Sequence, residues 1–278
     1  MFRFWLRAAS LLTILMTLFT LAAYIAGHTT DSDVLAFTST QGDTSTLIVM
    51  DTTRGFQYSI GEIYIHSYPV WSVDGRLAYY SDRDGNREIY VWDGAAALNI
   101  FNNPAEDYTP VWSSDGRLAF ASNRDGNFEI YVWDGAAAIN ISNNLADDYA
   151  PAWSADGRLA FYSNRDGNNE IYVWDGAAAL NISNNPAYDD SPDWSADGRL
   201  AFVSDRDGNF EIYVWDGIAA VNISNNLADD YAPAWSADGR LAFYSNRDGN
   251  FEIYVWDGTS AVNLTHSPSD EYYHAWRP

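Results

Sequence analysis

Residues 151–185 read PAWSADGRLAFYSNRDGNNEIYVWDGAAALNISNN, and this stretch decides the fold. Asp-Gly pairs divide it into short apolar runs, and such pairs are strong hairpin signals because glycine supplies the positive φ of a tight turn. The runs predict four strands, at Ala150–Ser154, Arg158–Ser163, Glu170–Trp174 and Ala179–Ser183. We expect Leu159 and Phe161 on one face of the second strand and Ala160 on the other, so both faces must be covered.

The same unit recurs with a period of 41 residues. One tryptophan series is Trp71, Trp112, Trp153, Trp194, Trp235 and Trp276, and a second is Trp92, Trp133, Trp174, Trp215 and Trp256. Four short antiparallel strands per repeat of about 40 residues, packed against copies of themselves, are typical of propeller blades. Residues 33–278 number 246, which is six times 41, and so predict a six-bladed, all-β propeller.

The two ends of this region are incomplete repeats. Val34–Ser39 and Leu47–Asp51 resemble the second and third strands of a first blade, and Tyr272–Trp276 is a Trp strand with no blade after it. We expect the C-terminal strand to complete the first blade. Closing the ring in this way removes exposed sheet edges that would invite aggregation.

Composition restricts the chemistry and the partners. The chain has 278 residues, 38 of them acidic and 15 basic, for a net charge of −23, and it contains no cysteine. Disulfides, thiolate metal sites and cysteine nucleophiles are therefore excluded. A charge this negative repels phosphate backbones, so we expect no nucleic-acid partner.

The first 30 residues form a separate targeting segment. Arg3 and Arg7 precede Ala8–Ala26, a stretch of 19 residues without a charged side chain. At about 1.5 Å per residue, a helix of this length approaches the thickness of a bilayer core. We predict an N-terminal membrane anchor with the remainder outside the cytoplasm, because the positive end stays inside. The alternative is a cleaved signal, which would leave a secreted or periplasmic protein.

The repeated string W-S-x-D-G-R-L-A-F-x-S-x-R-D-G-N-x-E-I-Y-V-W-D resembles the TolB-type propeller repeat, also called PD40 or WD40-like. The resemblance covers residues 33–278. The family commonly has proline after Trp-Ser, and this chain instead has Val73, Ser114, Ala155, Ala196 and Ala237. Propellers of this type serve as binding scaffolds, as gates on peptidases and as some polysaccharide lyases, so the resemblance does not choose among these functions.

No familiar catalytic string is present, neither a zinc-binding His-Glu-x-x-His, nor a Gly-x-Ser-x-Gly elbow, nor a phosphate-binding loop. We call the tryptophans of the first series, Trp71 to Trp276, the ring tryptophans, and the repeated serines after them are expected to cap the turns that follow. The tryptophans themselves are expected to be wedges between blades, where a propeller buries most apolar surface. We therefore expect a protein that is not an enzyme.

One repeated position is a candidate binding ring. Five residues before each ring tryptophan the chain carries His66, Asp107, Asp148, Asp189, Asp230 and Glu271. In a propeller this position lies near one mouth of the central channel, where carboxylates would attract cations or basic protein segments. In the alternative interpretation, each carboxylate bonds backbone amides of its own turn.

Three histidines fall on the two connections that flank the first blade. With Glu271 nearby, His66, His266 and His274 have the ligand types of a site for Zn²⁺ or another divalent metal. The alternative is that these histidines are incidental features of degenerate terminal repeats. This divalent metal is the only cofactor that the sequence suggests.

Near-identical blades favour binding over catalysis, because catalysis needs an asymmetric cluster and repeated blades present the same surface several times. We predict a monomeric, non-enzymatic, extracytoplasmic scaffold that recognises a protein or polymer partner with one propeller face. The alternative function is a carbohydrate-binding or polysaccharide-lyase-like propeller with a metal at the histidine positions.

Overall fold

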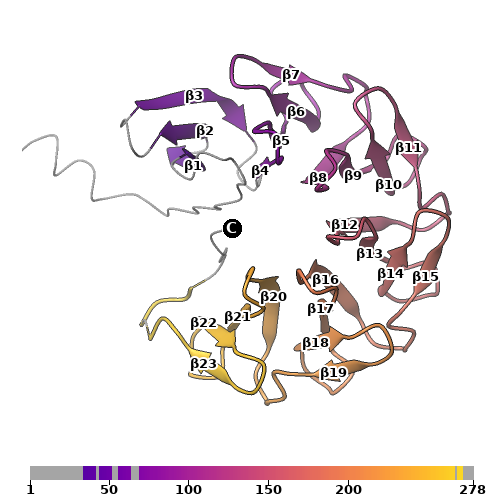
Figure 1. Ribbon diagram of the computed structural model, residues 1–278, viewed down its shortest axis with the longest axis vertical. Coiled ribbons are helices and arrows are strands. Elements are labelled where there is room, and N and C mark those ends of the chain that lie inside the picture. Colours follow the sequence, from indigo (N-terminus) through magenta and orange to yellow (C-terminus); the bar gives the residue numbers. More distant parts are fainter. Residues whose placement is uncertain (1–33, 42–43, 52–55, 64–68, 267, 272–278) are drawn as a thin grey trace, which may run out of the picture.

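The computed structural model describes residues 34–41, 44–51, 56–63, 69–266 and 268–271. Within these ranges the chain forms six antiparallel sheets and no helix. The sheets stand around a central axis like the blades of a propeller (Figure 1). The predicted all-β, six-bladed propeller is confirmed.

Blade 1 is the sheet β1–β3, and blades 2 to 6 are the sheets β4–β7, β8–β11, β12–β15, β16–β19 and β20–β23. In blades 2 to 6 the first strand lies nearest the ring axis and the fourth lies outermost (Figure 1). The strands are β1 Val34–Gln41, β2 Thr44–Asp51, β3 Phe56–Ile63, β4 Val70–Trp71, β5 Leu77–Ser81, β6 Glu88–Trp92, β7 Ala97–Asn99, β8 Asp107–Trp112, β9 Leu118–Ser122, β10 Glu129–Trp133, β11 Ala138–Asn140, β12 Asp148–Trp153, β13 Leu159–Ser163, β14 Glu170–Trp174, β15 Ala179–Asn181, β16 Asp189–Trp194, β17 Leu200–Ser204, β18 Glu211–Trp215, β19 Ala220–Asn222, β20 Asp230–Trp235, β21 Leu241–Ser245, β22 Glu252–Trp256 and β23 Ala261–Asn263.

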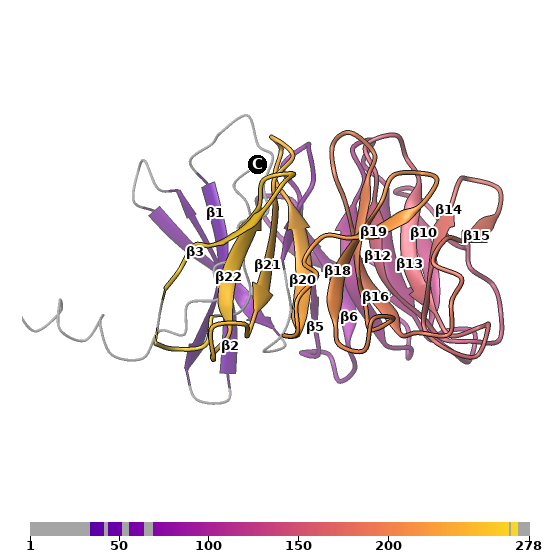
Figure 2. The same cartoon turned by 90° about the horizontal axis from the view of Figure 1, so that it is seen from below.

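The strand ends form two faces of the ring, which is about one strand length thick (Figure 2). We call one of them the connection face. It consists of the hairpin turns 82–86, 123–127, 164–168, 205–209 and 246–250 and of the blade connections 102–106, 143–147, 184–188 and 225–229. The opposite face carries the turns between the first and second strands and between the third and fourth strands.

The hairpins form as the Asp-Gly pairs predict. In blade 4, Leu159 of β13 pairs with Trp174 of β14, and Ser163 pairs with Glu170. At the tip, Gly167 has a φ of +105°, and its N–H donates to the carbonyl oxygen of Asn164 at 3.0 Å. A side chain at this φ would be strained, so the turn requires the glycine.

The serines after the ring tryptophans cap their turns, as predicted. In blade 4, Ser154 Oγ donates to Asp156 Oδ1 at 2.5 Å and accepts from the N–H of Arg158 at 2.8 Å. Arg158 Nε in turn donates to Asp156 at 3.0 Å. The S-x-D-G-R string is therefore one hydrogen-bonded turn.

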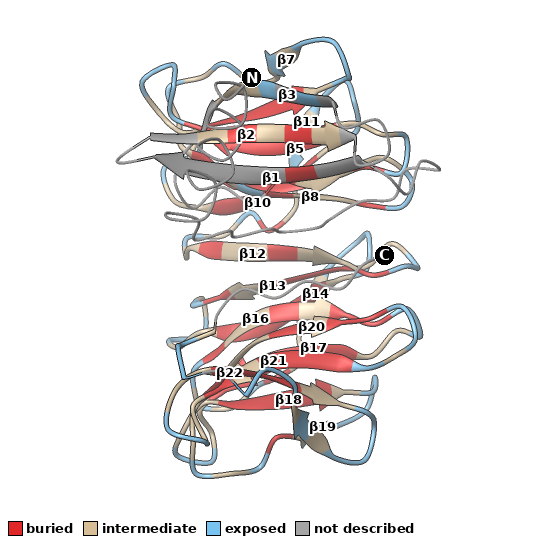
Figure 3. Cartoon of the chain, turned by 90° about the vertical axis from the view of Figure 1, so that its left-hand side faces the viewer, coloured by how far each residue is buried: buried red, intermediate tan, exposed pale blue. Residues whose placement is uncertain are grey.

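The hydrophobic core lies between the blades. Leu159 and Phe161 of blade 4 are fully buried against Ile130 of blade 3. Ala160, on the other side of β13, packs with Leu200 of blade 5, so both faces of the strand are covered as expected. The ring tryptophans within the described residues, from Trp71 to Trp235, pack into these blade-to-blade clusters and act as the predicted wedges. Figure 3 shows the buried strands in red and the exposed loops at their ends in pale blue.

The inner strands of blades 3 to 6 carry a bulge just before a proline. In β12 the register shifts between Tyr149 and Ala152, and Ala150 has a φ of +51°. The equivalent positive-φ residues are Thr109, Ser191 and Ala232. A bulge redirects the side chains that follow it, so it determines which side chains reach the ring axis.

Blade 1 contains the two predicted strands, as β1 and β2, and a third strand, β3. The predicted closing strand Tyr272–Trp276 lies outside the described residues, as does the predicted anchor at residues 1–30. The described ranges include no helix that could cross a membrane.

Candidate functional site

The aspartates predicted to ring the channel mouth are the first residues of the inner strands. Each is paired with an arginine from the hairpin turn of its own blade. The pairs are Asp107 with Arg124, Asp148 with Arg165, Asp189 with Arg206 and Asp230 with Arg247, each with an arginine Nη2 at 3.1 Å from the carboxylate. All four aspartates are fully buried.

A second buried carboxylate lies beside each of these aspartates. Between blades 3 and 4, Asn144 Nδ2 donates to Asp148 Oδ2 at 2.6 Å, and the N–H of Asn144 donates to Glu129 Oε1 at 2.8 Å. Ser142 Oγ donates to the other oxygen of Glu129 at 2.5 Å. Burial raises the pKa of Glu129, and the nearby charge of Asp148 raises it further. This network joins one blade to the next.

These four aspartates are therefore buried and paired, whereas the predicted binding ring needs carboxylates that a partner can reach at the channel mouth. The hairpin folds back over the start of the inner strand, so its arginine neutralises the carboxylate and shields it. The alternative interpretation, in which each carboxylate bonds backbone amides of its own turn, does not include this arginine. The sequence signal was the arginine that follows each aspartate by 17 residues.

The remaining predicted site residues are only partly described. Glu271 is half-buried, and its N–H donates to the carbonyl oxygen of Phe251 at 2.6 Å. His266 is exposed, whereas His66 and His274 lie outside the described residues. No three potential ligand side chains are grouped for a metal ion within the part of the chain that the structure describes. The histidine metal site stays a prediction.

The hairpin tips of the connection face carry exposed carboxylates. They are Asp84, Asp125, Asp166, Asp207 and Asp248. Each accepts a hydrogen bond from a tyrosine hydroxyl of its own blade, as Asp125 does from Tyr131. This bond lowers the pKa of Asp125, so the carboxylate stays charged well below neutral pH. The negative ring of this face is therefore at the hairpin tips.

Two leucines on the same face are almost entirely exposed. Leu145 and Leu227 have exposed fractions of 99% and 100% and lie in the connections that follow blades 3 and 5. The connection around Leu145 is held on both sides, because Asn127 Nδ2 donates to the carbonyl oxygen of Ala146 at 2.5 Å and the N–H of Ala146 donates to Asn144 Oδ1 at 2.7 Å. The leucine is thus presented on an ordered loop.

Blade 5 departs from its neighbours along the inner strand. Where blades 4 and 6 read DYAPAW, blade 5 reads DDSPDW from Asp189 to Trp194. Asp190 therefore replaces a tyrosine, Ser191 an alanine and Asp193 another alanine. The sequence analysis did not predict this difference, because it considered asymmetry only among the histidines. The signal is present in the sequence, since aligning the repeats places Asp193 opposite Ala152 and Ala234.

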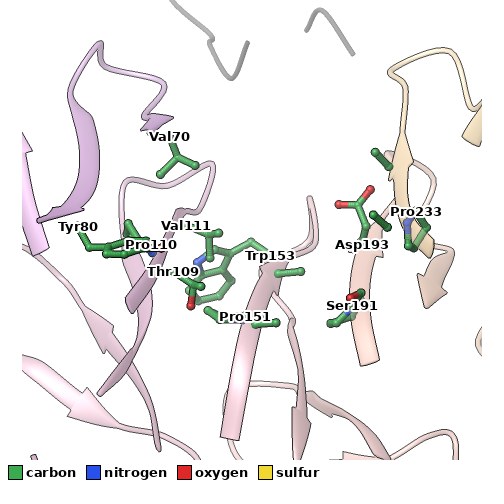
Figure 4. Close-up of a pocket in the computed structure, with 15 residues that line it drawn as sticks. Val70, Tyr80, Thr109, Pro110, Val111, Pro151, Trp153, Ser191, Asp193 and Pro233 are labelled. Atoms are coloured by element: carbon green, nitrogen blue, oxygen red, sulfur yellow. The ribbon is translucent and has the colours of Figure 1, made fainter. Parts of the chain in front are cut away.

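A partly open cavity of about 460 Å³ lies on the ring axis, with walls contributed by blades 2 to 6. Its walls are mostly small apolar side chains from the residues around each bulge. They include Val70, Val111, Ala152, Ala234 and the prolines Pro110, Pro151, Pro192 and Pro233. Figure 4 shows the carboxylate of Asp193 directed from β16 into this space, across from Val111 and Trp153.

Asp193 is the acidic residue of this lining. Its Oδ2 accepts a hydrogen bond of 2.7 Å from the backbone N–H of Trp235 in blade 6. Loss of hydration raises the pKa of Asp193 to about 7, although hydrogen bonds from the backbone of Trp235 and of Trp194 favour the charged form. No arginine or histidine is found among the described residues that line the cavity. Asp193 is therefore a carboxylate without a cationic partner in an apolar space.

No protein-family model matches the chain, and no curated protein matches it. Solved structures do match it. The β-propeller domain of the Trilobed protease from Pyrococcus furiosus is 17% identical with a TM-score of 0.72, over 89% of this chain and 82% of that one. TolB from Acinetobacter baumannii is 21% identical with a TM-score of 0.63, over 91% of this chain and 68% of that one.

An acylaminoacyl peptidase from Pyrococcus horikoshii is also similar, at 18% identity and a TM-score of 0.65. That match covers 88% of this chain but 45% of the peptidase chain. Together these likenesses show a TolB-like propeller fold. At such identities they show the fold alone.

Proposed function

We propose that this chain is a non-enzymatic scaffold that binds a protein partner through the connection face. The observation that carries the proposal is the combination of the exposed hairpin-tip carboxylates with Leu145 and Leu227 on the same face. Exposed apolar side chains rimmed by charged residues are typical of protein-binding surfaces. Because the hairpins and connections are hydrogen-bonded to each other, little ordering would be needed on binding.

The partner is expected to be basic where it meets this face. Hairpin-tip carboxylates such as Asp125 and Asp207 repeat from blade to blade, and the whole chain has a net charge of −23. Charge of one sign accelerates association with an oppositely charged partner and makes the rate depend on salt. The similarity to peptidase structures does not add catalysis to the proposal, because the chain covers less than half of those chains.

Capture by the full-length chain tests this function. Tagged protein is used to capture partners from an extract of its own envelope, and captured proteins are quantified for the wild type and for a Leu145→Ser, Leu227→Ser double variant. Ile218→Ser is the matched control, since Ile218 is 91% exposed in a turn of the opposite face. We expect the double variant to lose at least nine-tenths of its specific partner and the control to keep it. Equal capture by all three proteins, or retention of polysaccharide alone, would contradict the proposal.

We also propose that the propeller is extracytoplasmic and anchored through residues 1–30. The support is Arg3 and Arg7 ahead of the uncharged stretch Ala8–Ala26. Protease added outside sealed vesicles of known orientation tests this placement. We expect the protease to digest the propeller only in vesicles whose extracytoplasmic face points outward. Protection of the propeller in those vesicles would contradict the proposal.

A further inference from the structure

The cavity on the ring axis contains a feature that the protein-binding function does not use. Its walls are mostly apolar, with Thr109 and Ser191 as neutral polar residues, yet Asp193 points its carboxylate into it (Figure 4). Asp193 is half-buried, and placing a charged group in apolar surroundings is unfavourable unless the group is paired and hydrogen-bonded. Here Asp193 has backbone donors, from Trp235 and Trp194, and no cationic side chain beside it among the described lining residues.

The fold does not require an acid at this position. Blades 3, 4 and 6 carry Val111, Ala152 and Ala234 there, and their inner strands have the same bulge and the same proline before it. Valine and alanine offer no side-chain acceptor to a backbone N–H of the next blade. The hydrogen bond from Trp235 to Asp193 is therefore not needed to form the repeat, because the blades with valine or alanine at this position adopt the same strand without an equivalent side-chain acceptor.

A ligand cation would supply the missing partner. An ammonium group beside Asp193 would favour the charged carboxylate, whose protonation the apolar surroundings otherwise favour. The strongly negative chain concentrates cations around it, which assists entry. The cavity volume of about 460 Å³ is within the range of small-molecule sites.

We propose that the central channel binds a small organic ammonium ion, with the carboxylate of Asp193 as its counter-charge. The apolar body of the ligand packs against the proline and alanine walls, including Pro151 and Pro233. Apolar walls with a few placed polar groups are the usual composition of a small-molecule pocket. This site is independent of the connection face and of the protein partner proposed for it.

Calorimetric titration of the full-length protein in phosphate buffer at pH 8 tests the site. The probes are methylammonium, cyclohexylammonium and the neutral cyclohexanol, and an acetylated, amidated Ala-Lys-Ala peptide represents a lysine side chain. The variants are Asp193→Ala, which restores the residue of blades 4 and 6, and Asp193→Asn, which keeps the shape of the side chain.

Asp205→Asn is the matched control. It removes one charge from the same blade and installs the residue that blades 3, 4 and 6 carry at that position, Asn123, Asn164 and Asn246. The acceptor is retained, since Asp205 Oδ1 accepts from the N–H of Tyr188 at 2.8 Å and Asn123 Oδ1 accepts from Glu106 in the same way.

We expect cyclohexylammonium to bind the wild type and Asp205→Asn at one saturable site. Both Asp193 variants should bind it at least tenfold more weakly, and cyclohexanol should not distinguish them from the wild type. Absence of saturable ammonium binding, or unchanged affinity in Asp193→Ala, would overturn the proposal. If the lysine peptide bound in an Asp193-dependent manner and the free amines did not bind, the proposal would also be overturned. The cavity would then be a site for a basic side chain of a protein. None of these results depends on partner capture.

Discussion

The guanidinium of Arg117 lies over the indole ring of Trp153, 4.5 Å from the ring centroid, across the boundary between blades 3 and 4. Arg117 Nε also donates to Asp115 at 3.0 Å. The arrangement repeats at 4.4 Å for Arg76 with Trp112, Arg158 with Trp194 and Arg199 with Trp235. The S-x-D-G-R turn of one blade therefore holds the ring tryptophan of the next.

Replacing this arginine should weaken the contact between blades. Arg117→Ala is expected to lower the free energy of unfolding by about 1–2 kcal/mol, because it removes the cation–π contact and the apolar stem that covers the indole. Arg117→Lys should cost less, since it keeps the charge but lacks the planar group that stacks. Urea unfolding followed by tryptophan fluorescence measures both. Identical midpoints for wild type and Arg117→Ala would exclude a stabilising role.

Removing the arginine partner of a buried aspartate should have a larger effect. Arg165→Met leaves the fully buried carboxylate of Asp148 without its cation, and we expect a loss of about 3 kcal/mol or more. Adding Asp148→Asn removes the buried charge and retains an acceptor for Asn144. The double variant should therefore recover part of the loss in denaturant unfolding. A double variant less stable than Arg165→Met would contradict this.

Some carboxyl groups of the folded protein have a raised pKa and others a lowered pKa, and together they predict a maximum of stability at mildly acidic pH. Burial raises the pKa of Glu129 and Glu211 above their ordinary value of 4.5 in the folded state, and that of Asp193 to about 7. The folded protein therefore binds these protons more tightly and becomes more stable as pH falls from neutrality toward 4.5. Arginine hydrogen bonds lower the pKa of Asp115 and Asp156, so protonating these groups favours unfolding below their ordinary value of 3.8.

Urea unfolding from pH 3 to pH 8 checks this profile, and high salt provides the control. Salt screens the repulsion that a net charge of −23 produces, but it acts little on buried groups. The rise in stability between pH 7 and pH 5 should persist at high salt. Its disappearance there would assign the effect to overall charge instead of the carboxyl groups whose pKa burial raises.

Asp193→Ala should stabilise the protein at alkaline pH. The pKa of Asp193 is raised to about 7, so above that pH the folded state carries a disfavoured charge that the unfolded state does not penalise. We expect a gain of about 1 kcal/mol at pH 8, after allowing for the lost hydrogen bond from Trp235, and a smaller gain at pH 5. Asp205→Asn should show no such dependence on pH. A variant less stable than the wild type at pH 8 would show that the hydrogen bond dominates.

The amino-acid sequence alone determined the repeat, the strands and the hairpins. Strand Glu170–Trp174 agrees to the residue, and the turn at Gly167 forms where the Asp-Gly pair predicts it. These features depend on local backbone preferences and on a period of 41 residues, both of which can be read along the chain. The burial of Leu159 and Phe161 between blades followed from the same pattern, because a strand apolar on both faces must be covered on both.

Only the tertiary structure decided which carboxylates are exposed and which are enclosed. Asp148 is buried because Arg165 folds back onto it from the hairpin, whereas Asp166 at the tip of that hairpin remains in solvent. Asp193 faces a cavity because the ring brings five inner strands around one axis and a bulge redirects the residues after it. Exposure and partnership depend on contacts between segments that are distant in sequence. The spacing of 17 residues between Asp148 and Arg165 indicates an ion pair only once the pairing of β12 with β13 is known.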